Sequence, residues 1–224
     1  MKRLKHLKQM KHLVHSERVK ENEAGGTRQM SMGFIAERTD KVLIIRFDRP
    51  QTRNPLSVHV LEGLAIALDD HRSLVDLKAI IFTGTADSFA SGADLREIAA
   101  VTPETAREFS LRGQRLMNRI AKLDQHTIAA VNGYCFGGGL DLALACDRRI
   151  ASPNAFFSHP GSGLGIITGW GGTQRLARLI GQANALEMFL TAGRFTAETA
   201  LRIGLVEGVF EDACQAALEI ASSA

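Results

Sequence analysis

An α/β domain is the fold class that this sequence predicts, on two observations. Short apolar or alternating runs of strand length alternate along the chain with longer segments whose apolar residues recur at helical spacing. The chain has 224 residues, of which 45% are hydrophobic, and this is enough for one sizeable core. We therefore expect residues 1–32 to form a basic N-terminal arm and residues 33–224 to form the domain.

The first elements expected in the domain are a hairpin and a helix. Residues 34–37 and 42–47 are short apolar or alternating runs, and the Thr39-Asp40-Lys41 segment between them is typical of a turn. Apolar residues then recur at helical spacing over residues 60–68, preceded by Ser57 as the expected N-cap.

A strand, a long helix and another strand are expected next. Residues 77–82 are a continuous apolar run that predicts a buried strand. Thr102-Pro103-Glu104 is typical of a helix start, since proline suits the first helical position, and this helix should run to about Lys122. Residues 126–131 again predict a strand.

Two glycine-containing loops follow predicted strands and lead into helices. One lies in the stretch YCFGGGLDLALACD (134–147), with glycines at 137–139, and the other in residues 84–98, around Gly92. The first N–H groups of a helix have no partner within it and attract negative charge. Two such loops aimed at one point could stabilise an oxyanion. The alternative for the glycines is a tight turn packed against a neighbouring helix.

The positive charge of the chain is concentrated at its start. Residues 1–30 hold eight Lys or Arg against three Glu, which is +5, so the net charge of +3 leaves −2 for the rest. The arm could wind into a basic amphipathic helix that contacts nucleic acid or an anionic membrane. The alternatives, which we favour, are a solvated extension or a start codon assigned too early. We expect residues 25–28 to form a linker, and we do not expect nucleic acid as a partner.

Composition excludes several classes of protein. No apolar run is long enough to span a membrane, and no secretory segment follows the first residues. The three cysteines, Cys135, Cys146 and Cys214, lack the C-x-x-C spacing, which indicates reduced thiols and a cytoplasmic location. The histidines form no H-E-x-x-H motif, so no metal site is predicted.

Four motifs in order resemble a known family. They are DRPQTRNPLS (48–57), AIIFTGTADSFASGADLREI (79–98), AVNGYCFGGGLDLALACDRRIAS (130–152) and GWGGTQRLARLIG (169–181). Over roughly residues 33–222 the chain resembles the enoyl-CoA hydratase/isomerase family, also called the crotonase superfamily. The resemblance implies a ClpP/crotonase-like spiral of ββα turns that binds acyl-CoA thioesters. Coenzyme A would be part of the substrate, and no cofactor would be bound permanently.

The resemblance also implies roles for individual residues. The backbone N–H groups of Ala93 and Gly138 would polarise the thioester carbonyl, and Asp141 would be the acid/base. Family members hold the CoA portion with residues that correspond here to Arg53, Ala93, Asp94, Leu95 and Arg96. For Arg53 and Arg96 the alternative is an ordinary surface charge, and for Asp141 it is a helix cap.

The sequence departs from the hydratase pattern at the acidic positions. Of the two glutamates of family hydratases, the first falls on Asp141 and the second on Gly161; a further aspartate of dienoyl-CoA isomerase relatives falls on Gly169. We therefore expect a site with one carboxylate. His159 lies close in sequence to Gly161, where the second carboxylate is missing, and could move a proton. We favour the alternative, in which His159 is a packing residue. Trp170 is expected either as a pocket wall or as a packing residue.

Family members usually continue with further helices that cover the acyl pocket and build trimers or dimers of trimers. We accordingly expect a shortened C-terminal helical region and a homotrimer or dimer of trimers. Three functions stay open. They are enoyl-CoA hydration or isomerisation; another reaction in the same hole, such as acyl-CoA hydrolysis or decarboxylation; and acyl-CoA binding with weak catalysis and a nucleic-acid-binding arm.

Overall fold

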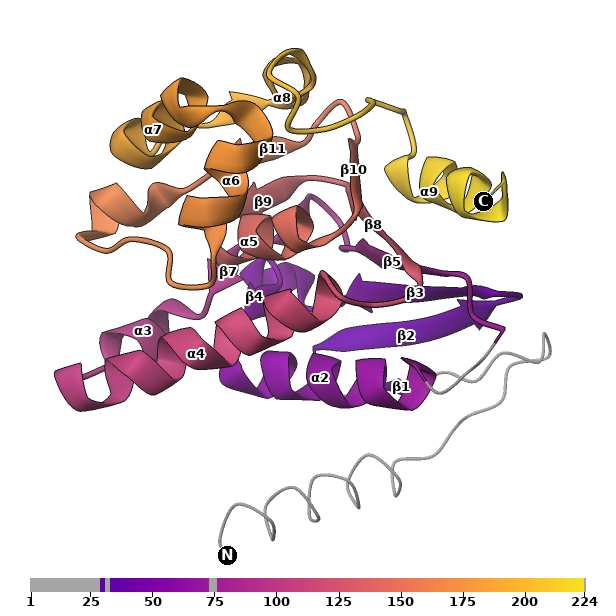
Figure 1. Ribbon diagram of the computed structural model, residues 1–224, viewed down its shortest axis with the longest axis horizontal. Coiled ribbons are helices and arrows are strands. Elements are labelled where there is room, and N and C mark those ends of the chain that lie inside the picture. Colours follow the sequence, from indigo (N-terminus) through magenta and orange to yellow (C-terminus); the bar gives the residue numbers. More distant parts are fainter. Residues whose placement is uncertain (1–28, 31–32, 73–75, 224) are drawn as a thin grey trace, which may run out of the picture.

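The computed structural model describes residues 29–30, 33–72 and 76–223, and Figure 1 shows their arrangement. The arm segment for which an amphipathic helix was one alternative, and the linker at 25–28, lie outside these described residues. Gln29–Met30 form β1, which pairs antiparallel with β2 (Phe34–Thr39) at the edge of the main sheet.

The main sheet has six strands in the order β1-β2-β3-β5-β8-β10. Its other strands are β2 (Phe34–Thr39), β3 (Val42–Phe47), β5 (Ala79–Thr83), β8 (His126–Val131) and β10 (Arg148–Ala151). The predicted hairpin is confirmed, since β2 and β3 pair antiparallel around Asp40, whose φ is 51°. From β3 to β10 all neighbours are parallel. The strand expected at 77–82 begins two residues later, at Ala79.

Both faces of this sheet are covered by apolar packing. Leu43 and Ile45 of β3 belong to the larger core, together with residues of α2 (Val58–Arg72), α4 (Pro103–Ile120) and α5 (Gly138–Ala145). Val42 and Ile44 belong to a smaller cluster. This smaller cluster is completed by alanines of the last helix, α9 (Ala213–Ser223), which Figure 1 shows apart from the other helices. Successive side chains of a strand point to opposite faces of the sheet, so the continuous apolar run of β3 contributes to the apolar packing on both faces.

Short strands form a second, four-stranded sheet in the order β12-β11-β9-β6. They are β6 (Ser88–Ala90), β9 (Tyr134–Phe136), β11 (Phe156–Ser158) and β12 (Phe195–Thr196). Main-sheet strands β5, β8 and β10 are each followed by one of these short strands, and then by helical structure. This repeat is the ββα turn that the resemblance implied. A separate parallel pair joins β4 (Pro55–Leu56) to β7 (Gly92–Ala93).

Besides α9, the helices are α2 (Val58–Arg72), α3 (Leu95–Ala99), α4 (Pro103–Ile120), α5 (Gly138–Ala145), α6 (Gly172–Ile180), α7 (Gln182–Thr191) and α8 (Ala197–Arg202), with 3-10 turns η1 (Pro50–Thr52) and η2 (Pro160–Leu164). Helices α2, α4 and α5 begin where the sequence signals predict, and α3 follows the predicted loop around Gly92; no start was predicted for the other helices. Ser57 caps α2, because its Oγ accepts a hydrogen bond from the Val60 N–H at 3.3 Å. At the start of α4 the Thr102 N–H donates to Thr105 Oγ1 at 2.9 Å.

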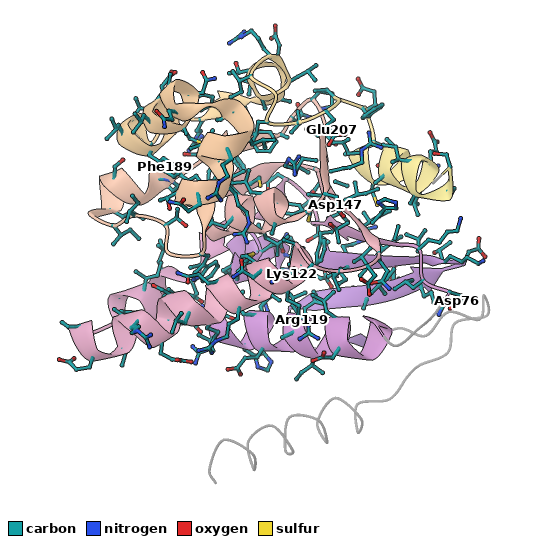
Figure 2. All side chains as sticks on the ribbon, viewed as in Figure 1. Asp76, Arg119, Lys122, Asp147, Phe189 and Glu207 are labelled. Atoms are coloured by element: carbon teal, nitrogen blue, oxygen red, sulfur yellow. The ribbon has the colours of Figure 1, made fainter. Side chains whose placement is uncertain are left out.

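The helices α2 and α4 run alongside one another below the main sheet (Figure 1). Arg119, labelled in Figure 2, joins them by an ion pair with Asp69. Within the described part of the chain, no helix is both long and apolar enough to cross a membrane.

Candidate active site

A cavity of about 370 Å³ opens between the start of α5, the β7–α3 segment and residues 159–170. Its apolar lining includes Leu95, Ile98, Phe109, Leu164 and Ile167. Of the residues proposed from sequence, the following line it: Ala93, Leu95, Gly138, His159, Gly161 and Trp170. Arg53, Asp94, Arg96 and Asp141 do not.

Ala93 and Gly138 both line the cavity, and their amide nitrogens lie close to one another. A Cβ built on Gly138 would lie 3.2 Å from the Ala93 nitrogen, and one built on Gly92 would lie 3.2 Å from the Gly138 nitrogen. Gly137 is the N-cap of α5 with φ 50° and ψ −117°, a conformation that favours glycine. The predicted helix start at Gly138 is confirmed, and its N–H has no partner within the helix.

Trp170 explains why residue 138 is glycine. Its indole lies against two glycines, Gly138 of α5 and Gly113 of α4, so that a Cβ at either position would overlap the ring. Phe109 also packs against the indole, at 5.9 Å between ring centroids, and Trp170 is 3% exposed. Trp170 is therefore both part of the cavity wall and a packing residue. The sequence analysis gave these two roles as alternatives.

Asp141, near the start of α5, is fully buried and lies behind the cavity lining. Its side chain does not cap the helix, because Gly137 is the N-cap and the carboxylate accepts a hydrogen bond from Thr168 Oγ1 at Oδ2. Burial raises the pKa of Asp141 from 3.8 to about 7. The Thr168 hydroxyl, the positive charge of Arg175 and backbone N–H groups at the start of α6 act in the opposite direction, because they favour the ionised carboxylate.

His159 faces the other oxygen of this carboxyl group. Its Nε2 lies 3.5 Å from Asp141 Oδ1, and neither atom has a hydrogen-bond partner. Burial lowers the pKa of His159 to about 4, and Phe189 of α7, labelled in Figure 2, packs on the imidazole at 4.8 Å between ring centroids. A gap of 3.5 Å makes a weak contact. We therefore describe the pair as a neutral imidazole beside a carboxyl group, not as an ion pair.

Two glycines near this pair determine which side chains the site can hold. At Gly172 a Cβ would overlap Asp141 Oδ1, so glycine there makes room for the carboxyl group. At Gly161, where family hydratases carry a glutamate, a Cβ would lie 2.6 Å from the Ile166 carbonyl oxygen. The Ile166 N–H donates to the Gly161 carbonyl at 2.9 Å, which fixes this loop. The backbone itself therefore leaves no space for a side chain at residue 161.

The charged residues proposed to hold CoA lie outside the cavity. Asp94 is the N-cap of α3 and accepts from the Arg96 N–H at 2.9 Å, and the Arg96 side chain pairs with it at 2.7 Å. This pairing lowers the pKa of Asp94. The Arg53 guanidinium lies 4.4 Å above the Tyr134 ring and 3.5 Å from Asp87. The alternative of ordinary surface charge therefore stays open for both arginines.

Sequence reasoning missed Thr168, which lines the cavity and bonds to Asp141. No local signal marks it, because the contact spans 27 residues. In the part of the chain that the structure describes, no group of three or more His, Cys, Asp or Glu side chains could hold a metal ion.

The fold and this cavity define a crotonase-like protein. The structure aligns with Pseudomonas aeruginosa DspI at a TM-score of 0.82 and 36% identity, covering 86% of this chain and 80% of that one. It aligns with an enoyl-CoA hydratase from Bacillus anthracis at a TM-score of 0.81 and 37% identity, covering 85% and 76%. The predicted fold is confirmed.

Residues 37–221 match the family model for enoyl-CoA hydratase/isomerase, and the chain belongs to that family. It is 40% identical over 178 residues to a short-chain-enoyl-CoA hydratase of Clostridium acetobutylicum, covering 79% of this chain and 68% of the relative. It is 39% identical to a crotonyl-CoA hydratase of Syntrophomonas wolfei, covering 80% and 69%. The protein is thus an enoyl-CoA hydratase/isomerase-like enzyme.

Proposed function

We propose that this enzyme hydrates or isomerises a short enoyl-CoA, with Ala93 and Gly138 as oxyanion hole and Asp141 as acid/base. One observation carries the proposal. Two backbone amides lie close together in the lining of an apolar cavity, and a buried carboxyl group is hydrogen-bonded to Thr168 of the same lining. The hydratases among the relatives support enoyl-CoA as the substrate class.

The amides would act on the charge that develops during the reaction. Attack at C3 of an enoyl thioester moves electrons onto the thioester oxygen, and the Ala93 and Gly138 N–H groups would stabilise the resulting enolate by donating to that oxygen. Removing one such donor typically costs about 3–4 kcal/mol of transition-state stabilisation. The positive end of α5 adds to the same effect, because Gly138 is its first residue.

Asp141 would supply the proton transfer. A pKa of about 7 leaves comparable amounts of carboxylate and carboxylic acid near neutrality. Such a group can accept a proton in one half of the reaction and return it in the other, which suits general acid–base catalysis. Gly161 carries no group that could share this work, so hydration should be slow compared with relatives that have two glutamates.

The cavity lining and the exposed side chains support three further parts of the proposal, namely substrate placement, self-association and location. We infer that the acyl chain lies along Leu95, Phe109 and Ile167, and that the CoA portion leaves past residues 93–96 toward Arg53. Exposed apolar side chains on the loop after η2 and on α7, such as Ile167 (67%) and Leu190 (73%), support self-association as a trimer or dimer of trimers. The unpaired cysteines of the described residues support a cytoplasmic location.

The test is a product assay on crotonyl-CoA and on its 3-enoyl isomer. We expect 3-hydroxybutyryl-CoA from the first and crotonyl-CoA from the second, with Asp141→Asn at least about 10²-fold slower in both. Release of free CoA thiol, with neither product formed, would contradict the proposal and favour thioester hydrolysis instead.

A further inference from the structure

We propose that Thr168 is a catalytic residue of this enzyme, whose hydroxyl carries the proton between Asp141 and the reacting atoms in the cavity. The inference rests on the proposed function, because it concerns the same carboxyl group. The new element is that the proton passes through Thr168, whose hydroxyl does not ionise at neutral pH.

The first step is that Asp141 does not reach the cavity. Its exposure is 0%, and it is absent from the cavity wall, whereas Thr168 lines that wall. Proton transfer requires hydrogen-bond reach between heavy atoms or one intervening group. A proton that moves between the cavity and Asp141 must therefore pass through a side chain that touches both.

Two side chains meet that condition, Thr168 and His159, and the contacts favour Thr168. The Thr168 hydroxyl already donates to Asp141 Oδ2, so the inner half of its path is formed. His159 Nε2 stands 3.5 Å from Oδ1 without a hydrogen bond. A relay through His159 would protonate one ring nitrogen before the other loses its proton, so the imidazole would become positively charged for a time. The burial of His159 opposes this charge.

The hydroxyl is held in place from both sides. The Gln114 side chain donates to the carbonyl of the next residue, Gly169, at 2.7 Å and anchors the segment to α4. On the other side, the Thr168 methyl lies next to Gly172 of α6, 3.0 Å from the position that a Cβ on this glycine would occupy. With its one proton directed to Asp141, the Thr168 oxygen keeps acceptor capacity for a molecule in the cavity.

The hydration step then balances without a further reagent. Water oxygen bonds to C3, the C2=C3 π electrons move toward the thioester oxygen, and the enolate forms in the oxyanion hole. As this happens, the water proton passes to Thr168 Oγ1, and the original Thr168 proton passes to Asp141 Oδ2. The reverse pair of transfers delivers one proton to C2, which restores the carbonyl, the Thr168 hydroxyl and the Asp141 carboxylate.

The experiment compares Thr168→Val, which keeps the shape without the hydroxyl, with Thr168→Ser, which keeps the hydroxyl. We expect kcat on crotonyl-CoA to fall about 10²-fold or more for Val and to stay within several-fold for Ser. The KM should change little, because the hydroxyl acts on protons and not on substrate binding. Equal melting temperatures and equal affinities for butyryl-CoA in calorimetry show that both variants are folded and bind.

A second readout separates this inference from the proposed function. Exchange of the C2 protons of butyryl-CoA in D₂O, followed by NMR, needs only the oxyanion hole and the proton path. Exchange that is lost in Val and kept in Ser supports the relay, even if hydration is not the native reaction. A Val variant that exchanges and turns over at the wild-type rate, or a Ser variant as slow as Val, overturns it. A wild-type protein inactive in both assays overturns the proposed function and the relay with it.

Discussion

Replacing Asp141 by Asn removes an ionisable group from the interior and keeps the shape of the side chain. The carboxyl group is fully buried, and burial raises its pKa from 3.8 to about 7. A folded state with the higher pKa binds the proton more tightly than the unfolded state. Stability due to this group is therefore present at low pH and is lost as the pH rises from about 4 to about 7.

The size of this loss follows from the same values. Each pKa unit corresponds to about 1.4 kcal/mol, so the rise to about 7 corresponds to about 4 kcal/mol of lost stability above neutrality. The Asn side chain carries no charge at any pH. It can accept from Thr168 as Asp141 does, and its amide can donate to His159 Nε2, which has no partner now.

The assay is urea unfolding of Asp141→Asn and of the native protein at pH 4 and at pH 8.5. We expect little difference at pH 4 and a variant more stable by up to about 4 kcal/mol at pH 8.5, although it is the less active protein. Asp124→Asn, at an exposed carboxyl group, is the matched control. A variant that is destabilised equally at both pH values would refute the reasoning, because the buried charge would then cost nothing.

Three further changes test other parts of the structure. Trp170→Ala should lower the free energy of unfolding by about 3–5 kcal/mol. Because the ring forms part of the cavity wall, the variant should also have a higher ratio of kcat/KM on an octenoyl-CoA to kcat/KM on crotonyl-CoA; an unchanged ratio would contradict that role. Gly161→Glu should lower the melting temperature without speeding hydration, and Gly161→Ala should lose similar stability, because the Cβ alone meets the Ile166 carbonyl; a stable, faster Glu variant would show that the loop yields. A chain that begins at Gln29 keeps β1 and should match the full chain in melting temperature and acyl-CoA affinity, and a large drop in either would assign a structural role to residues 1–28.

Elements with strong local signals could be predicted from the sequence. Ser57 and Thr102 lie at helix starts whose hydrogen bonds are made within three residues, so the signal and the structure occupy the same stretch. The start of α5 at Gly138 is local in the same sense. The apolar run of β8 is equally clear, and the predicted bounds are the observed ones.

Features that depend on contacts across the fold could not be predicted in this way. The strands of the second sheet are three residues or shorter, which is too short for an alternating pattern to be recognised. Residues 84–98 were expected to be a loop that leads into a helix, and the part before the helix contains β6 and β7. The spiral itself was expected from the family resemblance, not from periodicity. Thr168 meets Asp141 only because α5 and the segment before α6 pack together.

The packing of Trp170 also limits the order in which this chain can change. Because the indole occupies the space beside Gly113 and Gly138, neither glycine can acquire a side chain while the tryptophan is present. A smaller residue at position 170 would have to come first, and only then could position 113 vary freely. Position 138 would still be constrained by the approach of the Ala93 amide. Laboratory libraries that randomise these positions one at a time would therefore report position 113 as intolerant, whereas paired libraries that include position 170 would show which substitutions it accepts.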